Sequence, residues 1–322
     1  MKKVLVTGGA GFVGSYVVKQ LCTMGHDVYI YDSFITYLTP APRTPHVDFM
    51  QRLEGIFDRV HIIRGNTLDK DFFRRQLNLI KPDVVIHLAA MPLAALAIEH
   101  TEEAFQTICG STHSILEILR DFEHSCRLVY ISSSMVYGDF KSPVVQEDEH
   151  PKEPKDIYGA FKLAGETIVR AYEKNYGIDA VICRPSAVYG PFDSNARVIR
   201  KFIVNAMNGL PLTIDGDGGM RLDFTYVEDC ARAIALAADR PEAKGLTFNV
   251  TRGEGRSLGE LAEIVTKLFP RTEIEYRPQP KYMPMRGTLD IGRAQNVLGY
   301  KSCIDLEKGV KVYTEHLKKN SY

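Results

Sequence analysis

Short apolar runs alternate with helical patterns along the first 185 residues, and this alternation limits the possible folds more than any other feature. The runs are rich in β-branched residues and read KVLVT, DVYIY, VHIIR, DVVIHLAA, RLVYISS and AVICRP. Helical patterns lie between them, over 11–24, near 46–56, and over 69–79, 99–121 and 156–175. Strands joined through helices form right-handed crossovers, and strands buried on both faces are apolar throughout. The pattern therefore predicts an α/β fold with a doubly wound parallel sheet of the Rossmann type.

The alternation stops after RPSAVYGP, where glycine and proline concentrate in NGLPLTIDGDGG and RPQPKYMPMRG. Such segments are typical of loops and short elements. Between them, DFTYVEDCARAIALAA and LTFNV again have the patterns of sheet and helix. We therefore predict two lobes that are interleaved in the sequence. A Rossmann domain would comprise 1–185 and 223–252, and a smaller α/β lobe would comprise 186–222 and 253–322.

The composition excludes several classes of protein. The 322 residues include 40 lysines and arginines and 40 aspartates and glutamates, so no excess charge favours nucleic acid as a partner. The six cysteines contain no C-x-x-C pair, and no Cys/His cluster has metal-site spacing. No stretch approaches the roughly 18 apolar residues of a membrane span, and the N-terminus lacks a secretory pattern. We expect a cytoplasmic protein with reduced thiols and no metal or membrane partner.

A glycine-rich turn follows the first predicted strand. Gly8, Gly11 and Gly14 have the spacing G-x-x-G-x-x-G at the start of a predicted helix. Glycine lets backbone N–H groups approach a pyrophosphate at the positive end of that helix. Asp32 ends the second strand, where a carboxylate binds the adenosine ribose hydroxyls and repels a 2′-phosphate, which favours NAD over NADP. The alternative is a turn that uses glycine for packing alone, with Asp32 in a solvated loop.

Two groups of polar residues indicate an active site. Ser132, Ser133 and Ser134 follow the strand RLVYI, at the sheet edge where parallel α/β folds bind ligands. Tyr158 and Lys162 are four residues apart at the start of a predicted helix and share one face. A phenol has a pKa of about 10, so it acts as a base at neutral pH only where a cation stabilises the phenolate. The serines alone also suit a local turn, and a Tyr and a Lys at this spacing also occur by chance.

The order of these features resembles the short-chain dehydrogenase/reductase superfamily. The chain length and the segments HLAA, SSSMVYG, RPSAVYGP, DFTYVEDCARA and LDIGRAQNVLGY resemble its extended branch, the NAD-dependent epimerase/dehydratase family, which acts on nucleotide sugars. The resemblance covers nearly the whole chain. It implies bound NAD, a UDP- or dTDP-linked sugar as substrate, and a homodimer formed through the helices near 99–121 and 156–175.

The resemblance also implies roles for individual residues. Tyr158 would be the general base for a sugar hydroxyl, Lys162 would hold the nicotinamide ribose and lower the tyrosine pKa, and Ser133 would hydrogen-bond the reacting oxygen. Ser132 would lie near the cofactor. The remaining expected NAD contacts are Gly8, Gly11, Phe12, Val13, Gly14, Asp32, Asn66, Leu68, Leu88, Ala89, Ala90 and Pro185. Asn66 also suits a plain turn, and we interpret His87 as a packed histidine at a strand end.

The two residues after Ser133 bear on the reaction. Ser134 is expected to face the sugar, and Ser134 and Met135 stand where the family's 4,6-dehydratases have two acidic residues. Elimination of water needs an acid and a base, and methionine supplies neither. The resemblance therefore favours a 4-epimerase that oxidises the sugar to a 4-keto form and returns the hydride. The alternatives are a 4,6-dehydratase with other acids, a decarboxylase, an NAD(H)-linked sugar reductase or dehydrogenase, and a non-catalytic NAD-binding protein.

Several positions depart from the family pattern. Arg286 matches a diphosphate-binding arginine, but Leu222 replaces the arginine directly before DF, with Arg221 one position earlier. Ala187 replaces the usual asparagine before VYGP. Because arginine is the natural bidentate partner of phosphate, we expect Arg221 and Arg286 to bind the substrate diphosphate. The apolar loop AAMPLAALAIE indicates a neutral or deoxy sugar instead of a uronate, unless it only packs beneath the cofactor.

Overall fold

The larger lobe is built on a seven-stranded sheet in which every pair of neighbouring strands is parallel. The computed structural model describes residues 1–35, 37, 49–148, 152–278 and 284–320. The strands are β1 (Lys3–Thr7), β2 (Asp27–Asp32), β3 (Val60–Arg64), β4 (Val84–His87), β5 (Arg127–Ile131), β7 (Ala180–Arg184) and β12 (Thr247–Asn249). Their order is β12-β7-β5-β4-β1-β2-β3. The predicted Rossmann sheet is confirmed. Strands are added to one side of β1 up to β3 and to its other side from β4 onward, so the topological switch point lies between β1 and β4.

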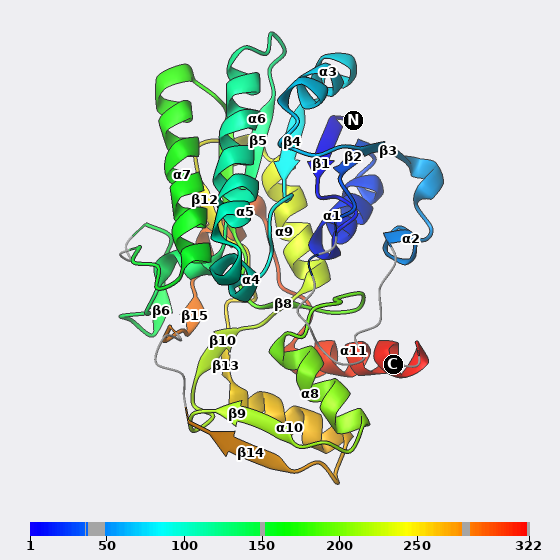
Figure 1. The fold of residues 1–322 in the computed structure, drawn as a ribbon, viewed down its shortest axis with the longest axis vertical. Coiled ribbons are helices and arrows are strands. Elements are labelled where there is room, and N and C mark those ends of the chain that lie inside the picture. Colours follow the sequence, from blue (N-terminus) through cyan, green and yellow to red (C-terminus); the bar gives the residue numbers. More distant parts are fainter. Residues whose placement is uncertain (36, 38–48, 149–151, 279–283, 321–322) are drawn as a thin grey trace.

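Helices cover both faces of this sheet (Figure 1). One face packs against α1 (Phe12–Thr23) and α9 (Val227–Asp239), and the other against α3 (Lys70–Ile80), α6 (Ser111–Arg120) and α7 (Ile157–Tyr176). Along β1, Val4 and Val6 enter the first core, whereas Leu5 enters the second. Burial on both faces explains the continuous apolar run of such a strand, whereas the edge strand β3 is half-buried or exposed along its length.

The predicted helix over 99–121 is divided in the structure. It consists of α4 (Ala94–Glu99), α5 (Thr101–Phe105), a π-helical turn η2 (Gln106–Gly110) and α6. Extra residues in a helical turn are frequent near functional sites. The helix expected near 46–56 is shorter, since α2 spans Phe49–Arg52 and residues 46–48 lie outside the described part. A 3₁₀ turn, η1 (Phe57–Arg59), leads from there into β3.

The smaller lobe has its own apolar core, between helices and a two-stranded sheet (Figure 1). Its helices are α8 (Val198–Met207), α10 (Leu258–Leu268) and α11 (Leu306–Lys319), beside the parallel pair β9 (Leu212–Asp215) and β14 (Ile274–Arg277). Short pairs join it to the larger lobe: β8 (Val188–Tyr189) with β11 (Thr225–Tyr226), β10 (Arg221–Asp223) with β13 (Gly255–Ser257), and β6 (Val144–Val145) with β15 (Thr288–Leu289).

The chain crosses between the lobes more often than the predicted boundaries imply. Helix α9 and strand β12 return to the larger sheet. However, the π-helical turn η5 (Ala294–Leu298) also packs into the larger core, although the sequence placed 253–322 in the smaller lobe. Short 3₁₀ turns η3 (Ser134–Tyr137) and η4 (Pro241–Ala243) complete the larger lobe. None of the helices in the described residues is long and apolar enough to cross a membrane.

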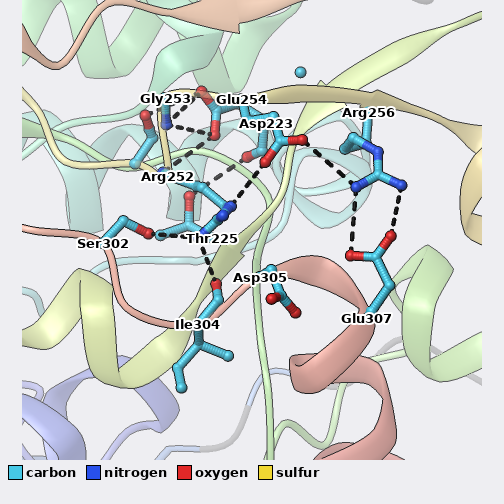
Figure 2. A network of polar contacts seen from close by, with 12 residues as sticks. Asp223, Thr225, Arg252, Gly253, Glu254, Arg256, Ser302, Ile304, Asp305 and Glu307 are labelled. Carbon is cyan, nitrogen blue, oxygen red and sulfur yellow. Dashed lines mark hydrogen bonds and ion pairs between the residues drawn. The ribbon is translucent and has the colours of Figure 1, made fainter.

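A polar network fixes the junction between the lobes (Figure 2). The carboxylate of Asp223 is 1% exposed and accepts hydrogen bonds from the backbone N–H groups of Arg252, Gly253 and Leu289. Burial raises the pKa of Asp223 to about 6. Arg252 donates to the carbonyl of Ile304 at 3.0 Å, at the entrance to α11. These bonds tie the segment after β12 to the smaller lobe.

Candidate active site

A cavity of about 980 Å³ lies along the carboxyl ends of β1, β2, β4, β5 and β7, where both lobes contribute to its walls. Ligands of open parallel sheets bind at this edge. The larger lobe supplies the glycine-rich turn, Asp32, the serines after β5 and the start of α7. The smaller lobe supplies Val198, Leu222 and Arg286 among others. The serines of the SSSMVYG segment are therefore cavity residues.

The glycine-rich turn is shaped for an anionic ligand. Gly8 has a φ of 71°, and a Cβ at this position would lie 2.8 Å from the backbone nitrogen of Ala89. A Cβ on Gly14 would overlap the carbonyl oxygen of Gly8. Gly11 begins α1 without a side-chain cap and with no acidic residue in the first turn. The free N–H groups and the positive end of the helix dipole are thus available to a phosphate.

Asp32 stands beside this turn at the end of β2. Its carboxylate accepts hydrogen bonds from the backbone N–H groups of Ala10, at 2.9 Å, and Phe34, at 2.8 Å. Burial raises the pKa of Asp32, although both hydrogen bonds oppose this effect. A carboxylate oxygen can accept two hydrogen bonds, and each oxygen of Asp32 accepts one of the two bonds named above, so both can still accept from ribose hydroxyls.

The predicted adenine contacts after β3 are only partly brought to the cavity. Asn66 lines it, and its side-chain oxygen also accepts a hydrogen bond from the backbone of Leu68 at 3.0 Å, as a turn residue does. Leu68 itself is 39% exposed and lies outside the cavity lining. Thr67 lines the wall in its place. The other expected cofactor residues line the cavity: Gly8, Gly11, Phe12, Val13, Gly14, Leu88, Ala89, Ala90, Ser132 and Pro185.

Tyr158 and Ser133 meet in the cavity. Asp156 caps α7 by accepting a hydrogen bond from Gly159, and this cap places Tyr158 in the first turn of the helix. Ser133 precedes the turn η3, and its hydroxyl contacts both the backbone of Met135 and the Tyr158 phenol. Burial raises the pKa of Tyr158, and the charge of Arg197 and the bond to Ser133 oppose this rise.

Lys162 lies one turn further along α7 and is 5% exposed. Its Nζ donates to the carbonyl of Ile131 at 2.8 Å and lies 5.9 Å from the centre of the Tyr158 ring. Burial lowers the pKa of Lys162 to about 8. In this structure the ammonium is held by the end of β5, and Arg197 is the cation with the larger effect on the phenol.

The two candidate diphosphate arginines have different surroundings. Arg286 lines the cavity and donates to the hydroxyls of Ser134 and Ser186, and burial lowers its pKa to about 10. Arg221 lies outside the cavity, because its guanidinium donates to the carbonyl of Gly255 at 2.7 Å and pairs with Glu260 at 3.4 Å. Leu222 lines the cavity wall instead.

The sequence-based prediction did not include several polar cavity residues, among them Arg52 on α2 and Asn195 and Arg197 in the loop before α8. Arg197 donates to the carbonyl of Val188 at 3.1 Å. No periodic pattern or known spacing surrounds these residues in the sequence, so their convergence on the cavity depends on the tertiary fold. Ala187 also lines the cavity, with a φ of 39° that is unusual for a residue with a side chain.

The prediction for His87 agrees with its surroundings. The ring is 3% exposed, with Nδ1 2.8 Å from the Thr7 hydroxyl and Nε2 3.1 Å from the Ser111 hydroxyl. Burial lowers the pKa of His87 to about 3, so the ring is neutral and packs between β1 and α6. Among the described residues, no cluster of three His, Cys, Asp or Glu side chains is arranged to hold a metal ion.

The comparisons with known proteins identify the family. The sequence model of the NAD dependent epimerase/dehydratase family matches residues 4–251. The chain belongs to this family. The predicted resemblance is thereby confirmed, and NAD is the cofactor on which the family depends.

Relatives within the family differ in reaction. A putative UDP-glucose 4-epimerase of Methanocaldococcus jannaschii is 32% identical over 328 residues, with 99% of each chain covered. A dTDP-glucose 4,6-dehydratase of Salmonella typhimurium is 28% identical, over 97% of this chain and 92% of its own. The structure of UDP-glucuronic acid 4-epimerase from Bacillus cereus, in complex with UDP-glucuronic acid and NAD, superposes with a TM-score of 0.87 at 30% identity, over 99% of both chains.

The cavity of this epimerase/dehydratase family member fits NAD. The glycine-rich turn leaves no room for side chains where a pyrophosphate would approach, and the Asp32 carboxylate lies beside this turn. The hydroxyl oxygen of Ser132 is buried, lines the same cavity and has no hydrogen-bond partner among the described residues. An unpaired buried hydroxyl is unfavourable unless a ligand binds it.

Proposed function

We propose that this protein is a nucleotide-sugar 4-epimerase that keeps its NAD through the catalytic cycle. One observation carries the choice of reaction: among the described residues that line the cavity, Asp32 is the only carboxylate, and it lies at the glycine-rich turn. Elimination of water needs an acid for the leaving hydroxyl and a base for a carbon-bound proton. Ser134 and Met135, beside the reacting groups, supply neither.

The residues around Tyr158 suit a reversible oxidation of an alcohol. We infer that the Tyr158 phenolate takes the proton of the sugar 4-hydroxyl while Ser133 hydrogen-bonds the same oxygen. Bound NAD supplies the acceptor, and later the donor, of a hydride. Tyr158 then returns its proton to the oxygen of the 4-keto sugar after the sugar has presented its other face. No other reductant is consumed, so the cofactor need not be exchanged between cycles.

The cations of the cavity support a diphosphate-linked substrate. Arg286 is desolvated and donates to the neutral hydroxyls of Ser134 and Ser186, and the carboxylates of Asp156 and Asp223 offset the effect of burial only in part. We propose that it binds the diphosphate of a UDP- or dTDP-sugar. The names of the relatives, which include UDP-glucose and dTDP-glucose enzymes, support these two nucleotides.

The sugar end of the cavity is largely apolar. Met91, Pro92, Leu93 and Met135 line it, which supports the neutral or deoxy sugar expected from the sequence.

We also expect the homodimer, since Ile98 and Phe105, on α4 and α5, are 53% and 46% exposed. The molar mass from light scattering measures the dimer directly, and a monomer at micromolar concentration would contradict it.

A substrate panel tests the reaction. The purified protein is incubated with UDP-, dTDP-, GDP- and CDP-sugars, UDP-glucuronate included, in heavy water, and the products are analysed by mass spectrometry and NMR. Inversion at C4 without deuterium uptake supports the proposal. Loss of water with deuterium incorporation would contradict it and identify the dehydratase alternative supported by the relatives. Tyr158→Phe is the control for background chemistry.

A further inference from the structure

A single buried arginine joins two walls of the cavity. Arg52 is 8% exposed and ends α2. Its Nη1 donates to the carbonyl of Ala10, in the glycine-rich turn, at 3.4 Å. Its Nη2 donates to the carbonyl of Phe192 and to the hydroxyl of Ser194, both at 3.2 Å. Ala10, Arg52 and Ser194 all line the cavity, so this guanidinium bridges its two sides at the cofactor end.

The segment that Arg52 holds is residues 190–197, which we name the 190s loop. It connects β8 to α8 and is anchored from both lobes. The hydroxyl of Tyr16 on α1 donates to the Pro191 carbonyl at 3.2 Å, and the hydroxyl of Tyr313 on α11 donates to the Asp193 carbonyl at 3.1 Å. Of these anchoring side chains, only Arg52 also lines the cavity.

The charges around Arg52 support a closing role. The carboxylate of Asp193 in the 190s loop and that of Asp32 both stabilise the charged form of Arg52 against the effect of burial. Asp32 also accepts a hydrogen bond from the backbone of Ala10, the residue whose carbonyl Arg52 binds. One cation therefore lies between a carboxylate of the cofactor wall and a carboxylate of the loop.

The 190s loop contains a buried hydrogen-bond acceptor at the cavity that has no partner among the described residues. Asn195 is 7% exposed and lines the cavity, and its side-chain oxygen has no hydrogen-bond partner among the described residues. A buried acceptor without a partner costs free energy until a donor binds it. A ligand with hydroxyl or amide donors would supply the missing hydrogen bond and thereby stabilise the loop in its closed position.

We propose that Arg52 retains the cofactor: its guanidinium holds the 190s loop against the glycine-rich turn, so that a bound dinucleotide leaves only after these bonds break. The inference rests on the proposed function in one respect, because an epimerase that returns its own hydride has use for a dinucleotide that stays bound. The bonds of 3.2 to 3.4 Å are long for charged donors, so each is weaker than a short charged hydrogen bond, and the loop opens when all of them break together.

Release of NAD tests this role without reference to turnover. The full-length protein is loaded with radiolabelled NAD and transferred into a large excess of unlabelled NAD, and the bound label is followed with time. Arg52→Met should release NAD about tenfold faster than the wild type, or more. Arg52→Lys keeps the charge but loses the forked geometry, and should fall between the two.

Matched controls separate retention from general loss of stability. Arg59 also donates to a backbone carbonyl, that of Cys22 at 2.7 Å, but lies outside the cavity lining, so Arg59→Met should release NAD at the wild-type rate. Ser194→Ala removes one partner of Arg52 without adding bulk and should accelerate release about two- to threefold, which keeps the proposal testable if Arg52→Met does not fold.

An Arg52→Met protein that unfolds cooperatively and releases NAD within twofold of the wild-type rate would overturn the inference. Equal acceleration in Arg59→Met would overturn it as well, and so would an unchanged rate in Ser194→Ala when Arg52→Met fails to fold. The proposed function fails in a different way: a wild-type protein that holds NAD but epimerises no sugar contradicts the reaction, while the comparison of release rates still decides the role of Arg52.

Discussion

Arg184→Met removes one half of a buried ion pair directly behind the active site. Arg184 on β7 donates from Nε and Nη2 to the two carboxylate oxygens of Glu166 on α7, at 2.8 and 2.6 Å, and the side chains are 2% and 6% exposed. Glu166 follows Lys162 by one helical turn. The third donor group, Nη1, binds the hydroxyl of Tyr137 at 2.7 Å, at the end of the turn that begins after Ser133. The pair therefore connects both catalytic segments.

The expected cost follows from the burial of the pair. Loss of one partner of a buried ion pair leaves an uncompensated charge and costs about 3–5 kcal/mol. Unfolding entropy of roughly 2.1 cal/mol/K per residue gives about 0.7 kcal/mol/K for a chain of 322 residues. The apparent melting temperature should therefore fall by about 4–7 °C. Since Glu166 loses its ion-pair partner and Tyr137 loses one of its hydrogen-bond partners, turnover should fall too, with less effect on NAD binding.

Thermal unfolding followed by circular dichroism measures this shift. The matched control is Arg120→Met, because Arg120 pairs with Glu117 at 2.8 Å on the exposed side of α6, where an ion pair contributes about 1 kcal/mol or less. The double variant Arg184→Met with Glu166→Met should recover part of the loss, since no charge is left buried. Equal shifts in Arg184→Met and Arg120→Met would show that burial of the Arg184–Glu166 pair is not the source of the lost stability.

Three further variants test the catalytic and cofactor residues. Tyr158→Phe should bind NAD normally and lower turnover by about two to four orders of magnitude, the range for a lost general acid–base group; turnover near that of the wild type removes Tyr158 from the mechanism. Asp32→Ala should weaken NAD binding and reduce discrimination against NADP in paired titrations, and an unchanged preference excludes Asp32 from the ribose site. Burial lowers the pKa of Lys162 from 10.5 to about 8. Between these two pH values the unfolded chain holds a proton that the folded chain has lost, so the free energy of unfolding of the ligand-free protein rises with pH across this window. Lys162→Met should remove this rise and increase the free energy of unfolding at pH 7 by up to about 3 kcal/mol. Thermal unfolding of both proteins at pH 7 and pH 10 measures this effect, and an equal response of the two proteins to pH would contradict the prediction.

The larger lobe was predictable because its signals are local. Strands such as β4 and β7 are buried on both faces, so their sequences are apolar up to the last residue, which is His87 in β4 and Arg184 in β7. Glycine is required wherever backbone approaches backbone, as at Gly8 and Gly14. Even there, the break in the helix over 99–121 was missed. The π-helical turn between α5 and α6 brings Thr107 to the cavity and has no composition signature of its own.

The substrate side was harder to predict because strand register decides it. Neighbouring residues of a strand point to opposite faces, so in β10 Leu222 lines the cavity while Arg221 turns to Gly255. The sequence identified an arginine near the right position but not the direction of its side chain. Arg52 and Arg197 come from irregular segments that only the packing of the two lobes brings to the cavity.

The proposed reaction requires that the hydride removed from the sugar returns to the carbon it left. The sugar nucleotide that the panel identifies, labelled with deuterium at C4, measures this directly when its product is analysed by NMR in ordinary water. We expect a C4 epimer that retains deuterium at C4, with no added cofactor. A product that has lost water, or deuterium that has left C4, would contradict it.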